Sequence, residues 1–242
     1  NEDFEGLEDY LKFLESIGVD AIIVADMGIF SLAKRVAPGL ELHVSTQAST
    51  TNWHTVQMWK ELGATRVVAA REVSLADLKE MKDNVDIEIE SFVHGSMCIS
   101  YSGRCLLSNY MTGNRDANRG QCSQSCRWKY SLVESNRPGE YYPIEEDEHG
   151  TYIFNSKDLC LIHRIPDLYE AGIDSLKIEG RMKSVHYCAT VAKVYRTAID
   201  TYLKEGKDWY VRPEWIAELE KISHRPYTCL LYTSPSPRDL ST

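Results

Sequence analysis

Four cysteines have a spacing that could bind a metal ion or an iron–sulfur cluster. Six, sixteen and thirty-seven residues separate the successive members Cys98, Cys105, Cys122 and Cys160. Thiolates are ligands for zinc and for iron, and four of them can complete one tetrahedral site. Structural zinc sites usually contain ligand pairs with about two to four residues between them, and only Cys122 and Cys126 form such a pair here. The wide spacing therefore favours a cluster, although spacing alone does not exclude zinc.

Ordinary buried thiols are the alternative, because free cysteine is among the most buried residue types. Cys188 fits that alternative, since it faces inward on a helix predicted at residues 185–205. The four spaced cysteines do not fit it, because they lie in or beside a segment rich in Gly, Ser, Asn and Arg. The chain has seven cysteines, an odd number, and no secretory signal pattern, so disulfides are not expected. These features favour reduced thiols and a cytoplasmic location.

A repeated pattern of helix, Gly and strand provides the scaffold for these cysteines. In each copy a helix ends at a Gly, two residues follow, and an apolar strand begins. The three copies span residues 14–26, 59–70 and 168–180. Gly18, Gly63 and Gly172 stand where a helix C-terminus needs the left-handed conformation, which Gly adopts at low cost. This is the junction expected in a fold of alternating helices and strands.

Alternating strands and helices predict a parallel sheet with right-handed crossovers. Further strands are expected at residues 41–46, 86–92 and 151–155. The predicted helices occupy residues 29–36, 52–62, 75–82, 185–205 and 213–222. We therefore predict an α/β fold, namely an incomplete TIM-like (β/α) barrel. Its N-terminal strands would be missing from this fragment, because a complete barrel has about eight. A doubly wound open sheet is the main alternative.

Composition divides the chain into a main domain and two C-terminal pieces. Residues 1–206 are predicted to form the barrel-like domain, with a Cys-rich insertion at residues 95–150 where the repeat stops. Residues 207–228 begin a C-terminal extension. Residues 229–242 follow neither helical nor strand periodicity and contain a Pro-Ser-Pro run, so we interpret them as a non-native tail derived from a sequencing adapter. The first residue is Asn rather than Met, which also indicates a fragment.

The charge distribution contrasts an acidic chain with one basic segment. The formal net charge is −9, which argues against a protein that coats nucleic acid over its whole surface. No apolar run approaches the ~20 residues that span a bilayer, so no membrane partner is expected. Residues 101–130 nevertheless carry five basic side chains against one acid, with Tyr101, Tyr110 and Trp128 interleaved. Phosphate contacts with base stacking on RNA, or a solvated loop folded around a cluster, both fit this composition.

The carboxyl ends of the predicted strands supply the remaining candidates, because functional residues of a barrel lie there. We predict catalytic roles for Glu90, His94, Lys177 and Glu179, and substrate-binding roles for Gln47, Arg71 and Arg181. Asp26 also ends a strand. Lys177 and Glu179 are two residues apart and so face the same side of one strand, where a structural ion pair is the alternative to catalysis. Arg71 and Arg181 could hold the carboxylates of a small acid by bidentate pairing, with surface salt bridges as the alternative.

The motifs around these residues resemble those of the peptidase U32 family, the so-called collagenase-like proteases. The resemblance is carried by ESFVHGSMCISYSGRCLLSNYMTGNRDANRGQCSQSCRW at residues 90–128, STQAS at 45–49, LKIEGRMKS at 176–184 and SHRPYT at 223–228. It covers essentially residues 1–228. Family members usually begin earlier, which would supply the missing barrel strands.

The resemblance implies hydroxylation chemistry in spite of the peptidase name. Several members are cytoplasmic bacterial hydroxylation factors, and one branch hydroxylates C5 of the wobble uridine in tRNA with prephenate as co-substrate. Other members act on ribosomal RNA or on ubiquinone precursors. The ubiquinone branch binds a 4Fe-4S cluster through four cysteines whose spacing matches Cys98, Cys105, Cys122 and Cys160. LKIEGRMKS and SHRPYT are most similar to the tRNA branch, so we expect an iron–sulfur-dependent tRNA hydroxylase, with tRNA and a related U32 subunit as candidate partners.

Two other functions compete with hydroxylation. A U32 collagenase-like peptidase would need a hydrolytic apparatus, but the sequence has no HExxH or GxSxG motif. His94 lies four residues from Cys98, so a thiol–imidazole pair would compete with cluster ligation. A cluster-bearing scaffold or an RNA-binding subunit without chemistry of its own would also account for the cysteines and the basic segment. Hydroxylation is the leading interpretation, peptidase the second and scaffold the third.

Overall fold

The structure, a computed structural model, describes residues 4–98, 100–128, 131–132, 138–139, 142–143 and 157–228. The chain divides into two compact units, and each is built from two separate stretches of sequence. The first unit contains Asn1–Phe92 and Arg164–Lys177, and the second contains Val93–His163 and Ile178–Thr242. The predicted domain boundaries at residues 206 and 228 stay predictions. The predicted tail at 229–242 lies outside the described residues.

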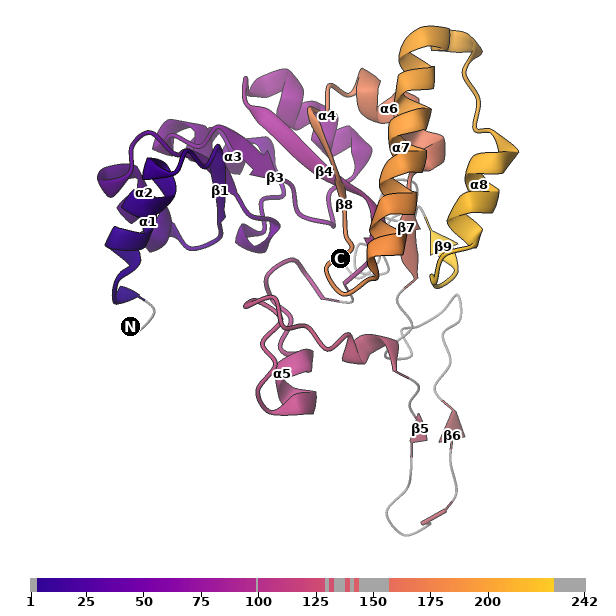
Figure 1. Cartoon of the computed structure of the whole chain (residues 1–242), viewed down its shortest axis with the longest axis horizontal. Helices are drawn as coiled ribbons and strands as arrows, with labels where there is room; N and C mark the ends of the chain where they lie inside the picture. Colours follow the sequence, from indigo (N-terminus) through magenta and orange to yellow (C-terminus); the bar gives the residue numbers. More distant parts are fainter. Residues whose placement is uncertain are drawn as a thin grey trace. The chain divides into compact units, whose positions relative to one another are not determined.

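Parallel strands that follow one another in chain order form the sheet of the first unit (Figure 1). The strands are β1 (Ala21–Val24), β2 (Glu41–Val44), β3 (Arg66–Val68) and β4 (Glu88–Ser96), whose last residues belong to the second unit. Each pairs in parallel with the next, and β8 (Ser175–Ile178) pairs with β4. The helices are α1 (Leu7–Ser16), α2 (Met27–Val36), α3 (Trp53–Leu62), α4 (Leu75–Asn84) and α6 (Ile165–Glu170).

Local sequence signals explain where these helices begin and end. The side chain of Asn52 accepts a hydrogen bond from Thr55 N at 3.0 Å at the start of α3, and Ser74 forms a capping box at the start of α4. Gly18, Gly63 and Gly172 have φ angles of 72°, 99° and 77°. The predicted left-handed glycines after the helices are therefore confirmed.

The core of the first unit lies between its helices and its sheet. Phe30 on α2 and Trp59 on α3 are buried with ring centroids 5.4 Å apart, and α4 buries Leu78 and Met81. Each such side chain contributes roughly 1.5–3 kcal/mol when it leaves water. An α/β fold with a mostly parallel sheet is confirmed. Closure into a TIM-like barrel stays a prediction.

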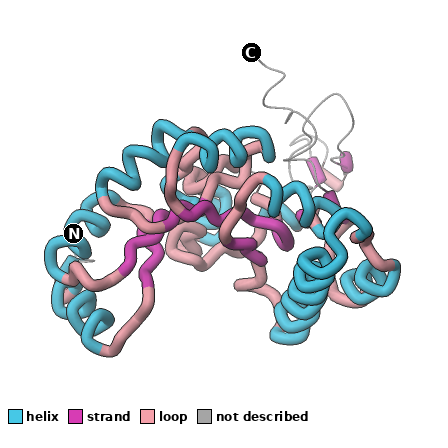
Figure 2. The backbone as a smooth tube through the Cα atoms, turned by 90° about the horizontal axis from the view of Figure 1, so that it is seen from above, coloured by secondary structure: helices cyan, strands magenta, loops and turns pink. Residues whose placement is uncertain are grey.

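Helices α7 (Val185–Glu205) and α8 (Pro213–Glu220) dominate the second unit and pack beside one another (Figure 1 and Figure 2). The end of β4 pairs antiparallel with β7 (Asp158–Cys160), and β7 pairs in parallel with β9 (Tyr227–Thr228). The unit also contains α5 (Leu107–Thr112) and a hairpin of β5 (Ser131–Leu132) and β6 (Tyr142–Pro143). The predicted helix at 185–205 is confirmed, and α8 lies within the predicted helix at 213–222.

The pairing of β7 corrects the expectation that every strand of the chain pairs in parallel. A parallel neighbour needs a crossover connection, usually a helix packed on the sheet. Between β4 and β7 the chain instead carries the Cys-rich segment, so β7 can return beside β4 in the opposite direction. The strand predicted at 151–155 lies outside the described residues, whereas β7 begins at Asp158. The insertion at 95–150 stays a prediction as a separate element, and its described part lies within the second unit.

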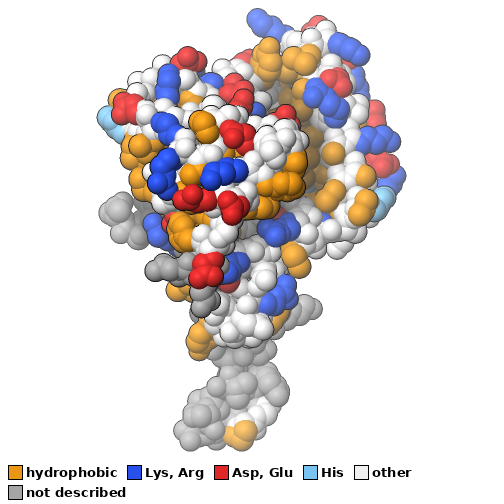
Figure 3. Space-filling view, turned by 60° about the vertical axis from the view of Figure 1, so that its left-hand side comes forward, with side chains coloured by type: hydrophobic (Ala, Val, Ile, Leu, Met, Phe, Trp, Pro, Cys, Tyr) orange, Lys and Arg blue, Asp and Glu red, His pale blue; other side chains and the backbone are white. Residues whose placement is uncertain are grey.

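The surface mixes charges of both signs. On the face drawn in Figure 3, Lys and Arg side chains are interspersed with Asp and Glu side chains. Within the described parts of the chain, no helix is both long and apolar enough to cross a membrane.

Candidate functional site

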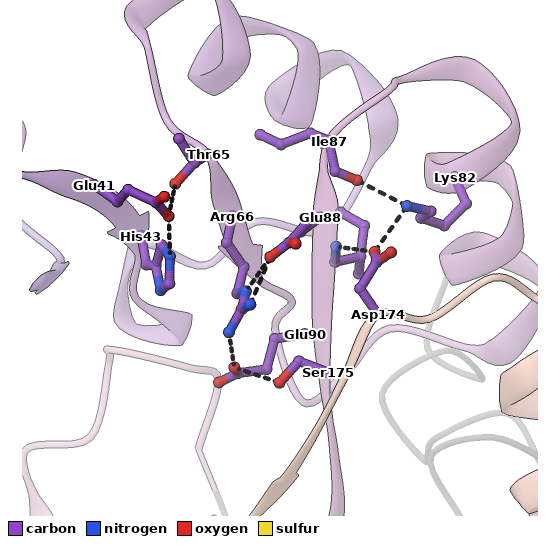
Figure 4. A network of polar contacts seen from close by, with 11 residues as sticks. Glu41, His43, Thr65, Arg66, Lys82, Ile87, Glu88, Glu90, Asp174 and Ser175 are labelled. Carbon is purple, nitrogen blue, oxygen red and sulfur yellow. Dashed lines mark hydrogen bonds and ion pairs between the residues drawn. The ribbon is translucent and has the colours of Figure 1, made fainter. Parts of the chain in front are cut away.

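A row of polar side chains crosses one face of the first unit's sheet (Figure 4). In the register of the strands, His43 on β2 is opposite Arg66 on β3, and Arg66 is opposite Glu88 on β4. Arg66 Nη2 lies 2.5 Å from Glu88 Oε2, and Arg66 Nη1 lies 3.4 Å from Glu90 Oε2. Glu90 and Glu88 are two residues apart on β4 and so share this face. The predicted catalytic residue Glu90 therefore belongs to a network that spans neighbouring strands.

Glu90 is the buried centre of this network. Its carboxylate accepts hydrogen bonds from Lys177 Nζ at 2.5 Å and from Ser175 Oγ at 2.8 Å, both on β8. Burial raises the pKa of Glu90, but Lys177, Ser175 and Arg66 together outweigh burial and hold that pKa below its usual value. Glu90 is therefore an ionised, weakly basic carboxylate at neutral pH. It is better suited to orienting Lys177 than to removing a proton from a substrate.

Phe92 lies on β4, as Glu90 does, and two cations lie near its ring. The Arg71 guanidinium carbon is 4.2 Å from the ring centroid, and Lys177 Nζ is 5.8 Å from it. Both distances fall within the range of cation–π attraction. Predicted residue Gln47 lies in the short 3₁₀ helix Thr46–Ala48. Asp26 instead caps α2, because its side chain accepts a hydrogen bond from Ile29 N at 2.9 Å.

His94 is buried in the second unit, with 1% of its surface exposed. Its ring lies 5.4 Å from that of Tyr195 and 5.3 Å from that of Tyr227, measured between centroids. Burial, which disfavours the charged form, lowers the pKa of His94 to about 4. The imidazole is therefore neutral and weakly basic at physiological pH, and it can accept a hydrogen bond.

The hydrogen bonds of Tyr195 indicate which nitrogen of His94 carries the proton. Tyr195 Oη donates to Val93 O at 2.9 Å and accepts from Leu161 N at 3.1 Å. A hydroxyl has one hydrogen to donate, so His94 Nδ1, 3.3 Å from Tyr195 Oη, is the donor in that contact. His94 Nε2 is then an unprotonated acceptor, and it is buried without a hydrogen-bond partner among the described residues. This arrangement suits the predicted catalytic role of His94.

Glu179 is held against the end of β4 rather than against Lys177. Its backbone N–H donates to His94 O at 2.8 Å, and its carboxylate accepts from Ser96 N at 3.2 Å. A Cβ added at Gly95, whose φ is 111°, would overlap the carbonyl oxygen of Glu179, so only glycine permits this approach. Lys177 forms an ion pair with Glu90 on the neighbouring strand.

Arg181 lies beside the Cys-rich segment. Its backbone N–H donates to Glu179 Oε1 at 3.2 Å. A Cβ added at Gly120 would overlap the guanidinium of Arg181, so this side chain passes directly over the Gly120 backbone. Gly120 lies two residues before Cys122. Arg181 therefore borders a predicted cluster ligand, in the same unit as His94 and Glu179.

The four predicted cluster ligands all belong to the second unit. Cys98, Cys105, Cys122 and Cys160 are partly exposed and not joined in disulfides. Cys160 is directly opposite His94 in the β4–β7 register, and Cys122 Sγ accepts a hydrogen bond from Gln124 N at 3.3 Å. Reduced thiols of this number fit an iron–sulfur cluster by their chemistry. In the described ranges, no three His, Cys, Asp or Glu residues are arranged to hold a single metal ion. Ligation stays a prediction.

A buried ion-pair cluster near Cys160 is a feature that sequence reasoning missed. The carboxylate of Asp158, on β7, is fully buried. Arg127 Nη1 lies 2.5 Å and Lys183 Nζ 3.5 Å from its oxygens, and Arg225 N donates to it at 3.1 Å. Burial raises the pKa of Asp158, but these partners, Arg127 foremost, hold it below its usual value. The signal in the sequence was the position of Lys183 and Arg225 within the LKIEGRMKS and SHRPYT motifs.

The basic segment keeps its aromatic surface but commits part of its charge to structure. Tyr110 on α5 is 84% exposed, and Trp128 is 45% exposed. Arg115 donates to the carbonyl oxygens of Gln121 and Cys122 at 3.1 and 3.3 Å, and Arg127 pairs with Asp158. Arg104 and Arg119 remain exposed, while Lys129 lies outside the described residues.

Comparisons with known proteins place the chain in one family. The model of Peptidase family U32 matches residues 1–241. The chain is 53% identical to tRNA hydroxylation protein P1 of Bacillus subtilis (strain 168), over 93% of this chain and 53% of that protein. It is 41% identical to tRNA hydroxylation protein P of Escherichia coli (strain K12), over 90% of this chain and 56% of that protein.

The chain thus spans about half the length of the curated relatives it matches. Among solved structures, that of the U32 peptidase Mk0906 matches with a TM-score of 0.41 at 14% identity, over 74% of this chain and 62% of that one. The family assignment rests on the sequence matches alone. Because the family model covers nearly the whole chain and the relatives are this similar, the chain belongs to Peptidase family U32.

Proposed function

We propose that this chain is part of an iron–sulfur-dependent tRNA hydroxylation protein that acts on C5 of the wobble uridine with prephenate as co-substrate. The observation that carries the proposal is the 53% identity to a tRNA hydroxylation protein across 93% of the chain. Identity at this level extends over the strands and segments that hold Glu90, His94, Lys177 and the cysteines. The protein would work in the cytoplasm, with tRNA as substrate and a related U32 subunit as a candidate partner.

Cys98, Cys105, Cys122 and Cys160 would hold a 4Fe-4S cluster in this proposal. The support is their chemistry, because all four are partly exposed cysteines of one compact unit and none is in a disulfide. A bound cluster would supply one-electron redox chemistry or a structural link between the segments. His94, opposite Cys160 on the neighbouring strand, would present its unprotonated Nε2 to a substrate group as a hydrogen-bond acceptor.

A small dicarboxylic acid such as prephenate would be bound by cations. In the first unit, Arg71 and Lys177 both lie near Phe92 and offer two positive groups on one sheet face. Guanidinium groups pair well with carboxylates because their donors match the carboxylate geometry. Gln47 and Arg181 keep their predicted substrate-binding roles in the two units. Glu90 would orient Lys177 through their 2.5 Å contact.

The exposed aromatic surface of the second unit would contact tRNA. Tyr110 and Trp128 are exposed rings, and Arg104 and Arg119 are exposed cations in the same segment. Unpaired bases stack on such rings, and each base stacked in this way is worth about 1–3 kcal/mol. A tRNA anticodon loop offers unpaired bases and phosphates together, which suits this combination of side chains.

The sequential order of β1 to β4 supports the finer fold assignment. Consecutive parallel neighbours are the order of a (β/α) barrel, whereas a doubly wound sheet reverses direction at a switch point. We therefore extend the proposal to the complete protein, whose longer chain would close this sheet into a TIM-like barrel. A crystal structure of the full-length protein tests this, and an open sheet would contradict it.

The test of function is the amount of wobble 5-hydroxyuridine in tRNA, measured by mass spectrometry of nucleosides. A strain without the full-length protein should lose the modification. The wild-type gene should restore it, and Cys105→Ala should not. Cys188→Ala is the matched control, because Cys188 is not a predicted ligand and lies on α7, where its thiol donates to the Gly180 carbonyl oxygen at 3.6 Å. Unchanged modification in the deletion strain would refute the assignment.

The two competing functions predict other results. A peptidase would cleave gelatin or casein with the purified full-length protein, and that activity would survive Cys105→Ala. A non-catalytic scaffold would bind tRNA and a cluster. The purified protein with tRNA, prephenate and an oxidant would then form no hydroxyuridine. Adding the partner subunit would produce the modification.

A further inference from the structure

Arg127 connects three of the four cysteine-bearing segments of the second unit. It is the last residue of the 3₁₀ helix Ser125–Arg127 and follows Cys122 by five residues. Its Nη1 lies 2.5 Å from an oxygen of Asp158, which precedes Cys160 by two residues on β7. Its Nη2 donates to Met97 O at 3.4 Å, and Met97 immediately precedes Cys98. One guanidinium thus joins the segments that carry Cys98, Cys122 and Cys160.

We propose that Arg127 is a positioning residue that holds these three segments together so that their thiols can assemble an iron–sulfur cluster. The inference rests on the proposed function, in which the cysteines are the cluster ligands. Arg127 would touch neither the cluster nor a substrate. It would act through the backbone of Met97 and the carboxylate of Asp158.

The contact is shielded from water, so breaking it would leave a charge buried without its partner. The side chains of Arg127 and Asp158 are 8% and 0% exposed. Lys183 shares the Asp158 carboxylate, and Arg225 donates to it through its backbone N–H. Arg225 also donates a side-chain hydrogen bond to Arg127 O. The buried carboxylate is therefore neutralised and hydrogen-bonded, a condition that buried ion pairs need in order to persist.

A guanidinium is the group that this geometry requires. Its planar fork carries five donors at fixed angles, so one side chain can reach a carboxylate and a carbonyl oxygen in different directions. A lysine ammonium at the same position would keep the charge but could not span both acceptors. Arg127→Lys therefore separates the linking role from the charge.

Linking the segments reduces the entropy that cluster assembly must overcome. Sixteen and thirty-seven residues separate Cys105 from Cys122 and Cys122 from Cys160, and closing loops of this length has an entropic cost that grows with their length. Arg127 closes the connections to Cys98 and Cys160 before any metal arrives. The segment of Cys105 is held separately, because Asn118 Nδ2 donates to Gly103 O at 3.3 Å.

The test compares full-length wild-type protein with Arg127→Lys, both purified without oxygen. Iron and sulfide per chain and the rate of cluster loss to a chelator are the readouts. We expect the variant to lose its cluster about 10–100-fold faster, the effect usual for residues that orient metal ligands from outside the first coordination shell. Arg196→Gln is the control, because Arg196 is an exposed cation on α7 of the same unit and pairs with the exposed Asp200. It should retain the cluster as wild type does.

A second variant keeps the test decisive if Arg127→Lys does not fold. Arg225→Ala removes the side-chain bond to Arg127 O but leaves the ion pair with Asp158, so cluster loss should accelerate by a smaller factor. Circular dichroism of the cluster-free proteins shows which variants fold. Folded variants that hold the cluster as long as wild type would overturn the role of Arg127 alone. A wild-type protein without iron would overturn the cluster, and the role of Arg127 with it.

Discussion

Among the described residues, the two units each contain one buried carboxylate with two cations, but the surroundings of the two carboxylates differ. The partners of Glu90 are the more exposed, since Arg66 and Lys177 are 26% and 30% exposed. The partners of Asp158 are more buried, because Arg127 and Lys183 are 8% and 15% exposed. Glu90 is paired by residues of neighbouring strands, whereas Asp158 is paired by residues outside the sheet.

The difference in exposure separates a sheet face around Glu90 that can still bind a ligand from a set of ion pairs around Asp158 that holds segments of the fold together. Cations near water can exchange a water molecule for a substrate carboxylate at modest cost. Cations buried around Asp158 cannot, because an unpaired charge in the interior is costly. The ion pairs around Glu90 are therefore suited to substrate binding, and those around Asp158 to positioning the cysteines.

The largest effect is expected at Asp158. Asp158→Ala leaves the Arg127 guanidinium buried without its counter-charge, so the free energy of unfolding should fall by about 3–5 kcal/mol. Urea denaturation followed by circular dichroism measures it. Asp200→Ala on α7 is the control, since its pair with Arg196 is exposed and should contribute about 0.3–0.5 kcal/mol. An equal decrease in the free energy of unfolding in the two variants would contradict the distinction between buried and exposed ion pairs.

Gly95→Ala tests how tightly the end of β4 is packed. The added Cβ would overlap Glu179 O, and the φ of 111° is unfavourable for alanine. Left-handed backbone strain of about 1–2 kcal/mol and overpacking of about 1–3 kcal/mol predict a loss of about 2–5 kcal/mol. Gly113→Ala is matched, because its φ is 77° and nothing lies within 4 Å of the added Cβ. The free energy of unfolding of Gly113→Ala should fall only by the backbone strain. A decrease as large as that of Gly95→Ala would contradict the close packing of Gly95 against Glu179.

Glu90→Gln should have an intermediate effect. The amide keeps a hydrogen bond with Ser175 but loses the charge facing Lys177, and stability at pH 7 should fall by about 1–2 kcal/mol. The pKa of Glu90 is depressed in the folded protein, so its contribution is complete above the unfolded pKa and is lost as pH falls through the folded pKa. Between neutral and acidic pH, the free energy of unfolding should therefore decrease less for Glu90→Gln than for wild type. An unchanged pH dependence would show that the carboxylate is not stabilised by its partners.

Arg35→Ala should have the smallest effect. Arg35 and Glu8 are 72% and 51% exposed, and ion pairs of this kind contribute about 0–1 kcal/mol. The thermal unfolding midpoint should not change measurably. A large decrease would show that exposure is a poor guide to the strength of ion pairs in this protein, and the comparison between the two clusters would lose its basis.

Local sequence patterns predicted the first unit well. The glycine junctions at Gly18, Gly63 and Gly172 adopt the expected backbone conformation, because that requirement depends on one residue and its helix. Strands β1 to β4 lie at or near their predicted positions, since apolar residues on a buried parallel strand are contiguous. Glu90 was singled out as a strand-end residue, but it is the third residue of β4, because the strand continues to Ser96. Its partner was missed, because pairing with Lys177 depends on β8 lying beside β4.

The second unit was predicted less well, apart from its long helix. Strand β7 has only three residues, too few for a periodic signal, and its antiparallel pairing with β4 was not expected. Helix α5 lies where no regular element was expected, and the left-handed Gly113 ends it. The Asp158 cluster was also missed, because Arg127 and Arg225 are 31 and 67 residues away from that carboxylate along the chain. No local pattern encodes such a pairing.

The sequence by itself determined the alternation of helices and strands, the four candidate cysteines and the family motifs. These follow from residue type and short-range spacing, because local backbone conformation depends on residues that are close in sequence. Only the tertiary structure decided that Lys177 neutralises Glu90, that His94 is buried beside Tyr195, and that Arg127 meets Asp158. Those choices depend on which distant segments become neighbours, and the free energy of burying a charge or an imidazole is fixed only when its neighbours are in place.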